Sequence, residues 1–88
     1  MWLKNGDKLI NLTLVRMMVT DYYHNSKLYL IRLDDYTLSY SSVDLRDFLY
    51  EEILKNLELG TVRILDLSEL ERNYVGKFPT LEEFKQNN

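Results

Sequence analysis

Apolar and polar residues alternate in short runs over the first half of the chain, and turn-forming residues separate these runs. The sequence Asn5-Gly6-Asp7 lies between two such runs and predicts an N-terminal β-hairpin, because these residue types tolerate a positive φ. The alternation shifts by one residue at positions 12–15, so a bend, bulge or tight turn is expected there. Residues 27–33 are apolar at most positions, which is typical of a central strand buried on both faces, and residues 36–40 alternate like a further strand.

The spacing of apolar residues becomes helical after residue 41. Ser41 followed by Asp44 fits a capping box, in which the serine oxygen accepts from a backbone N–H and the carboxylate reaches back to the cap. Gly60 supplies the left-handed residue that commonly ends a helix. At 100° per residue, one face of the helix is apolar and the opposite face is charged. The apolar face consists of Val43, Leu45, Leu49, Tyr50, Ile53, Leu54 and Leu57. The charged face consists of Asp44, Asp47, Glu51, Lys55 and Glu58.

Short elements are expected after Gly60. Residues 61–65 are typical of a strand, which could pair in parallel with a strand of the first half. Two Ser/Thr-x-x-Glu sequences, at 68–71 and 80–83, predict helical turns.

These elements predict an α+β fold. The expected architecture is a small, mainly antiparallel sheet of about four to five strands, packed by one amphipathic helix and followed by a short strand and helix extension. One domain spanning residues 1–88 is expected, because so short a chain builds a single core. Within it, residues 1–60 form the strand meander and helix, and residues 61–88 form the extension.

Composition excludes several classes of function. The chain has no cysteine, so it has neither disulfides nor thiolate metal sites. It has no apolar run long enough to cross a membrane and no secretory signal, which indicates a cytoplasmic protein without a membrane partner. The net charge of −3 disfavours nucleic-acid binding, because non-specific affinity for phosphates depends on lysine and arginine.

No arrangement of residues typical of an enzyme or a cofactor site is present in the sequence. His24 is the only histidine and lies in a turn signal, so it has no second histidine or cysteine with which to bind a metal. There is no glycine-rich phosphate loop, and the adjacent carboxylates would need a cleft to separate their pKa values. A non-enzymatic protein without cofactor or metal is therefore predicted.

The acidic residues concentrate between positions 34 and 58, a stretch that contains seven carboxylates and only two basic residues, Arg46 and Lys55. They are Asp34, Asp35, Asp44, Asp47, Glu51, Glu52 and Glu58. Helix physics explains part of this pattern, since acidic residues in the first turn favour the helix dipole and Glu51 can pair with Lys55. The alternative is that all of them except Glu52 form a surface that binds a basic patch on a partner protein.

Tyrosine is the other frequent residue type, with seven in the chain. Most lie in predicted strands, where cross-strand packing explains them. Tyr22 and Tyr23 are adjacent, and because neighbouring strand residues point to opposite faces, at least one is expected to be exposed. Tyr36 follows the Asp34-Asp35 turn. These three tyrosines are predicted to add aromatic contacts to the acidic surface.

The layout of the first two-thirds of the chain resembles that of short bacterial and phage proteins with an N-terminal hairpin, a strand meander and one helix. The residues that carry the resemblance are Trp2-Leu3, Asn5-Gly6, Ile10-Asn11-Leu12, Val15, Leu38 and Tyr40. The resemblance implies a small accessory protein, for example from a phage or another mobile element, and it assigns no site residue.

Three functions stay open. The favoured one is a small acidic protein-interaction module, such as a phage or mobile-element inhibitor of a host protein that handles nucleic acid. The second is a structural subunit that assembles into a homo-oligomer through a strand edge. The third is a nucleic-acid-binding accessory protein that combines exposed tyrosines with the basic residues of the first half. Those basic residues are Lys4, Lys8, Arg16, Lys27 and Arg32.

Overall fold

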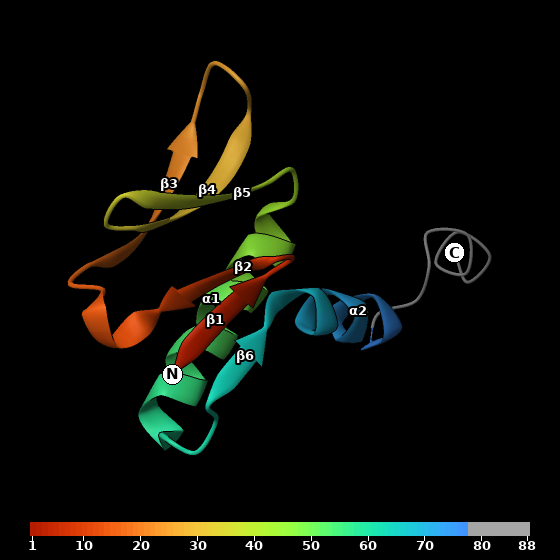
Figure 1. Cartoon of the computed structure of the whole chain (residues 1–88). Coiled ribbons are helices and arrows are strands. Elements are labelled where there is room, and N and C mark those ends of the chain that lie inside the picture. The colour runs from red at the N-terminus through yellow and green to blue at the C-terminus, as the bar shows by residue number, and fades with distance from the viewer. Residues whose placement is uncertain (78–88) are drawn as a thin grey trace.

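Two small sheets and two helices make up the part of the chain that the structure describes. The computed structural model describes the backbone of residues 1–77 and the side chains of residues 1–74. The elements, shown in Figure 1, are β1 (Trp2–Asn5), β2 (Lys8–Asn11), the 3-10 helix η1 (Leu12–Leu14), β3 (Met18–Tyr23), β4 (Leu28–Leu33), β5 (Tyr36–Tyr40), α1 (Val43–Leu59), β6 (Ile64–Asp66) and α2 (Leu67–Lys77). The helical turn predicted at 80–83 lies outside the described residues.

The strands confirm the α+β class and are divided between two three-stranded sheets. The first sheet has the order β2-β1-β6 and the second has the order β3-β4-β5. β1 and β2 form the predicted hairpin, with Gly6 at a φ of 64° in its turn. β6 pairs in parallel with β1, which places Leu65 opposite Leu3. The strand that follows Gly60 therefore returns to the first strand of the chain.

The division into two sheets has a local cause at residues 12–15, where the sequence predicts a change of direction. The Asn11 side chain caps η1 by accepting from the Thr13 N–H at 3.0 Å. The Val15 N–H then donates to the Leu12 carbonyl at 3.2 Å. This tight turn takes the chain away from β2, so that β3 starts a new sheet.

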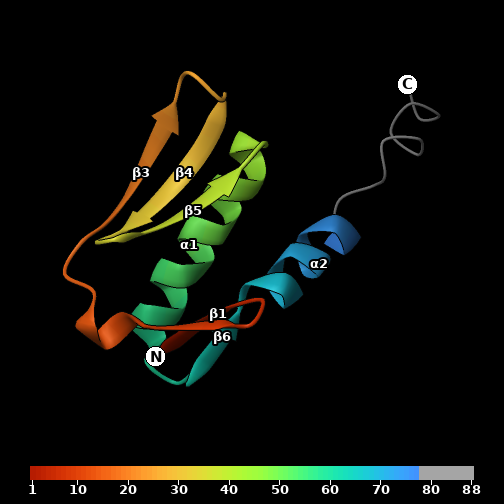
Figure 2. The same ribbon diagram turned by 45° about the horizontal axis from the view of Figure 1, so that its top comes forward.

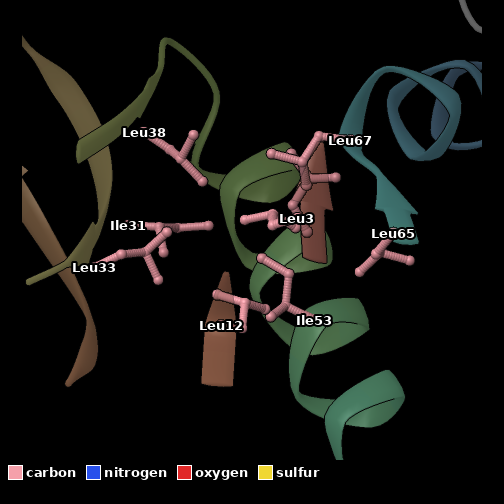
Figure 3. Close-up of a cluster of buried hydrophobic side chains, with 9 residues drawn as sticks. Leu3, Leu12, Ile31, Leu33, Leu38, Ile53, Leu65 and Leu67 are labelled. Atoms are coloured by element: carbon pink, nitrogen blue, oxygen red, sulfur yellow. The ribbon is translucent and has the colours of Figure 1, made fainter. Parts of the chain in front are cut away.

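Helix α1 runs along β4 and β5, and the sheet that contains β1 and β6 lies near the C-terminal half of the helix (Figure 2). One buried cluster joins all these elements. Figure 3 shows Ile31, Leu33 and Leu38 of the second sheet facing Leu3, Leu12 and Ile53. The complete cluster is Leu3, Leu12, Ile31, Leu33, Leu38, Leu49, Ile53, Leu65 and Leu67.

Helix α1 ends as predicted but begins one residue later than the capping-box pattern indicates. Ser42, in an extended conformation, is the N-cap, and its Oγ accepts from the Leu45 N–H at 3.2 Å. The prediction of Ser41 as the cap is wrong, because it is Ser42 that has the extended backbone of a cap and makes the capping hydrogen bond. Gly60 ends the helix with a φ of 70°, and its N–H donates to the Asn56 carbonyl.

Two further predictions are corrected. β4 is the central strand of its sheet, but it is not buried on both faces, because Arg32 is exposed while Ile31 and Leu33 are buried. The segment after Gly60 forms a strand only from Ile64, and the turn predicted at 68–71 is part of the longer helix α2. Asp66 precedes α2 and caps its first turn, since its Oδ1 accepts from the Ser68 N–H at 3.0 Å.

The phenol of Tyr40 gives a prediction about stability at high pH. Burial raises the pKa of this hydroxyl above its ordinary value of 10.0, and the charges of Glu71 and Tyr36 raise the pKa further. Because the folded-state pKa is the higher one, the contribution to stability is complete below the unfolded pKa and is lost as pH rises towards the folded pKa. We expect Tyr40→Phe to reduce the loss of stability between about pH 9 and about pH 11, measured by urea unfolding. An equal loss in both proteins would contradict this.

Candidate functional site

The acidic residues predicted on one face of α1 lie together on its exposed side. Asp44, Asp47, Glu51 and Glu58 are all exposed, and these four residues are called the acidic ridge below. On the opposite side, Leu49 and Ile53 are completely buried. The helical periodicity therefore places the charged residues on the exposed side, and Leu49 and Ile53 on the packed side, correctly. Val43, Leu54 and Leu57 were also expected to pack, but 37%, 43% and 42% of their surface is exposed.

Most of the negative charge on the acidic ridge has no partner within the described chain. Among residues 1–74, whose side chains the structure describes, the ion pairs with an N···O distance of 4.0 Å or less are Arg32 with Asp21 and Arg46 with Asp47. The predicted pair of Glu51 with Lys55 is not among them. Asp44, Glu51 and Glu58 therefore face solvent without an ion pair within 4.0 Å to any of these described side chains.

A groove between α1 and α2 lies beside the acidic ridge. Phe48 and Tyr74 form its aromatic part, with ring centroids 5.1 Å apart and ring planes tilted by 43°. Asp44, Asp47 and Glu51 complete the lining of a space of about 410 Å³, which is called the aromatic groove below. This volume lies at the small end of ligand sites. The arrangement suits a single extended cationic side chain, because carboxylates attract the charge and aromatic faces add cation–π attraction.

Sequence reasoning missed both aromatic residues of this groove. The available signal was the position of Phe48, four residues after Asp44 and three before Glu51, which places it beside the charged face. Tyr74 could be added only once residues 67–77 were known to form a helix that packs against α1.

Asp34 and Asp35 occupy the tight turn between β4 and β5, and Asp34 has a structural role there. Its two carboxylate oxygens accept from the N–H groups of Arg16 and Met17, each at 3.0 Å. Its own N–H donates to the Met17 carbonyl at 3.3 Å. Asp34 thus fixes the segment before β3, while Asp35 is exposed beside it. The structure connects Asp34 to residues 16–17 and not to the acidic ridge.

The three predicted tyrosines have different surroundings. The Tyr36 hydroxyl accepts from the Asn5 side-chain amide at 2.9 Å, and this bond links the two sheets. Tyr22 is half-buried and packs against Tyr29, with ring centroids 4.8 Å apart. Tyr23 has 49% of its surface exposed, which confirms that one member of the adjacent pair faces solvent. These contacts leave Tyr23 as the most accessible of the three.

Arg46 holds α1 against the second sheet, a role that the sequence did not indicate. Its Nη1 donates to the carbonyl oxygens of Asp21 at 2.9 Å and Leu30 at 3.1 Å. Its Nε donates to Asp47 at 2.7 Å, and the guanidinium lies 5.6 Å from the centre of the Tyr29 ring. Only 11% of the Arg46 side chain is exposed. Its charge therefore serves the packing of the fold as well as balancing one carboxylate of the ridge.

The structure bears on the two alternative functions through particular contacts. β3 is an edge strand, and the Asp21 carboxylate accepts from the Tyr22 N–H within it at 2.8 Å, which occupies a donor that a second chain would need. Of the five basic residues considered for nucleic-acid binding, Arg32 pairs with Asp21 and Lys8 lies over the Tyr36 ring. These contacts favour neither alternative.

Within the described residues, no cluster of three or more histidine, cysteine or carboxylate side chains could hold a metal ion. None of the helices described there is long and apolar enough to cross a membrane. Comparisons with protein-family models, with curated proteins and with solved structures find no significant match to the chain. The resemblance to short bacterial and phage proteins therefore stays a prediction.

Proposed function

We propose that this chain is a small, non-enzymatic interaction module that binds a basic surface of a partner protein through the acidic ridge and the aromatic groove. The observation that carries the proposal is the exposed charge of Asp44, Glu51 and Glu58 without a counter-charge within 4.0 Å from the described residues. Unpaired carboxylates on one helix face raise the rate of encounter with a cationic partner and suppress association with acidic ones.

The aromatic groove supports the same proposal independently of net charge. A lysine or arginine of the partner that enters between α1 and α2 meets Phe48 and Tyr74 as well as three carboxylates. Cation–π attraction is stronger where water is excluded, so this contact contributes to affinity in addition to the encounter rate. Arginine is the better match, because its planar guanidinium both stacks on rings and pairs with carboxylates.

The partner class that we propose is a protein that handles nucleic acid. Such proteins carry basic grooves that recognise regularly spaced phosphates. Carboxylates three or four residues apart on a helix are about 5–6 Å from one another, which is comparable to the phosphate spacing. A chain with this surface would act as an inhibitor that occupies the basic groove, and a phage or mobile-element origin agrees with the layout of its first two-thirds.

Affinity capture from a bacterial lysate, followed by binding kinetics with the purified partner, tests the proposal. We expect a stoichiometric complex whose association rate falls at least about tenfold between about 50 mM and about 300 mM salt. The double substitution Asp47→Lys with Glu51→Lys should abolish capture.

The matched control is Asp7→Lys with Glu69→Lys, two exposed carboxylates away from the ridge that change the net charge by the same amount. The control should still capture the partner. Equal capture by the ridge variant and the wild type, or equal loss in the ridge and control variants, would refute a localised acidic site.

A further inference from the structure

A second groove, lined mainly by apolar residues together with Arg16, lies along the C-terminal half of α1. Its one wall is the segment that leads from η1 into β3, and its other wall is formed by Leu54 and Leu57. The space measures about 290 Å³ and is called the Met17 groove below. Met17, Leu54 and Leu57 are 52%, 43% and 42% exposed, although the helix pattern predicts both leucines in the packed face. Single exposed leucines are common, but three large apolar side chains around one hollow indicate a docking surface.

The wall that contains Met17 is preformed. Asp34 makes three hydrogen bonds to residues 16–17, two through its carboxylate and one through its N–H. A wall that is already ordered does not need to be ordered on binding, so the apolar contacts contribute to affinity with a smaller entropic cost. Methionine in such a wall adapts to different apolar side chains.

The charges around the Met17 groove indicate the chemistry of its occupant. Leu54 lies three residues after Glu51 and four before Glu58, so carboxylates of the acidic ridge flank the apolar wall. A second copy of this chain would bring these carboxylates towards one another, and each copy has a net charge of −3. Arg16 lies on the opposite wall. The lining thus combines apolar side chains with the basic Arg16, and the carboxylates of Glu51 and Glu58 lie next to it on α1.

We infer that the Met17 groove docks an amphipathic helix of the partner protein, with an apolar stripe against Leu54, Leu57 and Met17 and with cationic residues over Glu51 and Glu58. Helices bind in this way when an apolar face fills a groove and the flanking charges fix the orientation. The inference rests on the proposed function for the basic character of the partner. It adds the class of structural element that the partner presents.

The probe for this inference is a fluorescently labelled peptide of leucine and lysine, about 18 residues long so that it forms an amphipathic helix. Fluorescence anisotropy measures its affinity for the full chain. Leu57→Gln and Met17→Gln should each weaken binding about tenfold, because each removes apolar surface that the peptide covers. Leu9→Gln is the matched control, since Leu9 is 55% exposed on β2, away from the groove, and this variant should bind within about twofold of the wild type.

Variants of the acidic ridge and a scrambled peptide distinguish helix docking in the Met17 groove from binding by charge alone. Unchanged affinity in Leu57→Gln and Met17→Gln, with weaker binding in Glu51→Gln with Glu58→Gln, would overturn the inference and leave the proposed function standing. Weaker binding in Leu57→Gln and Met17→Gln, with unchanged affinity in Glu51→Gln with Glu58→Gln, would overturn the acidic ridge as the recruiting surface. Equal binding of a peptide with the same composition in scrambled order would refute helix docking. Concentration-dependent dimers that Leu57→Gln abolishes, detected by light scattering, would instead assign the groove to a second copy.

Discussion

Replacement of Arg46 with methionine is expected to lower the free energy of unfolding by about 2–3 kcal/mol, which for a chain of this size corresponds to a fall in Tm of about 10–20 °C. Arg46 donates to the carbonyls of Asp21 and Leu30 from a largely buried position. Methionine retains much of the aliphatic stem but provides no donor, so both carbonyls lose a charged hydrogen bond. Urea unfolding followed by circular dichroism measures the difference.

Two further arginine variants separate this role from that of charge alone. Arg46→Lys keeps the charge but has a single ammonium in place of the planar fork, so it should recover less than half of the loss. Arg32→Met removes a half-exposed ion pair with Asp21 and should change stability by no more than about 1 kcal/mol. If Arg46→Met were as mild as Arg32→Met, α1 would not be held to the sheet by this side chain.

Replacement of Asp34 with alanine is expected to lower the free energy of unfolding by about 2 kcal/mol, although the residue is exposed in the β4–β5 turn. Alanine removes both acceptors for the N–H groups of Arg16 and Met17. It also has to adopt the φ of 52° that Asp34 has, a left-handed conformation that disfavours residues with a Cβ other than asparagine and aspartate. Thermal and urea unfolding measure the sum of these two effects.

Two other substitutions at position 34 separate the loss of the hydrogen bonds from the strain of the left-handed backbone. Asp34→Asn tolerates the left-handed backbone and keeps one acceptor oxygen, so it should cost less than half as much as alanine. Asp34→Gly relieves the backbone but has no acceptor, and it should fall between the two. A cost for alanine below about 0.5 kcal/mol, the range of ordinary surface substitutions, would show that the Asp34 bonds do not fix residues 16–17.

The parts of the fold that sequence predicts are those with local signals. Asn5-Gly6 specifies the first hairpin because glycine accepts the positive φ, and Gly60 ends α1 for the same reason. The shift of apolar phase at 12–15 indicates a change of direction, but it does not say that η1 divides the strands into two sheets. The pairing of β6 with β1, which completes the first sheet, joins residues about sixty positions apart, and no local pattern specifies it.

In the candidate site, too, sequence predicts only the features that have a local signal. Helical periodicity alone places the acidic ridge on the exposed side of α1, because Leu49 and Ile53 fix the buried side. The roles of Arg46 and Asp34 require knowledge of which backbone groups lie within reach, and both residues looked like members of a charge pattern in the sequence. The aromatic groove requires α2, whose Tyr74 meets Phe48 only in the folded chain.

An NMR titration of the labelled full chain with an arginine-rich peptide tests the acidic-ridge proposal most directly. We expect the backbone amide shifts to concentrate at Asp44, Asp47, Phe48, Glu51 and Tyr74, and to disappear in Asp47→Lys with Glu51→Lys while that variant keeps its fold. Shifts of similar size at Asp7, Asp35 and Glu69 would mean that the peptide follows net charge over the whole surface, and that the ridge is not a site.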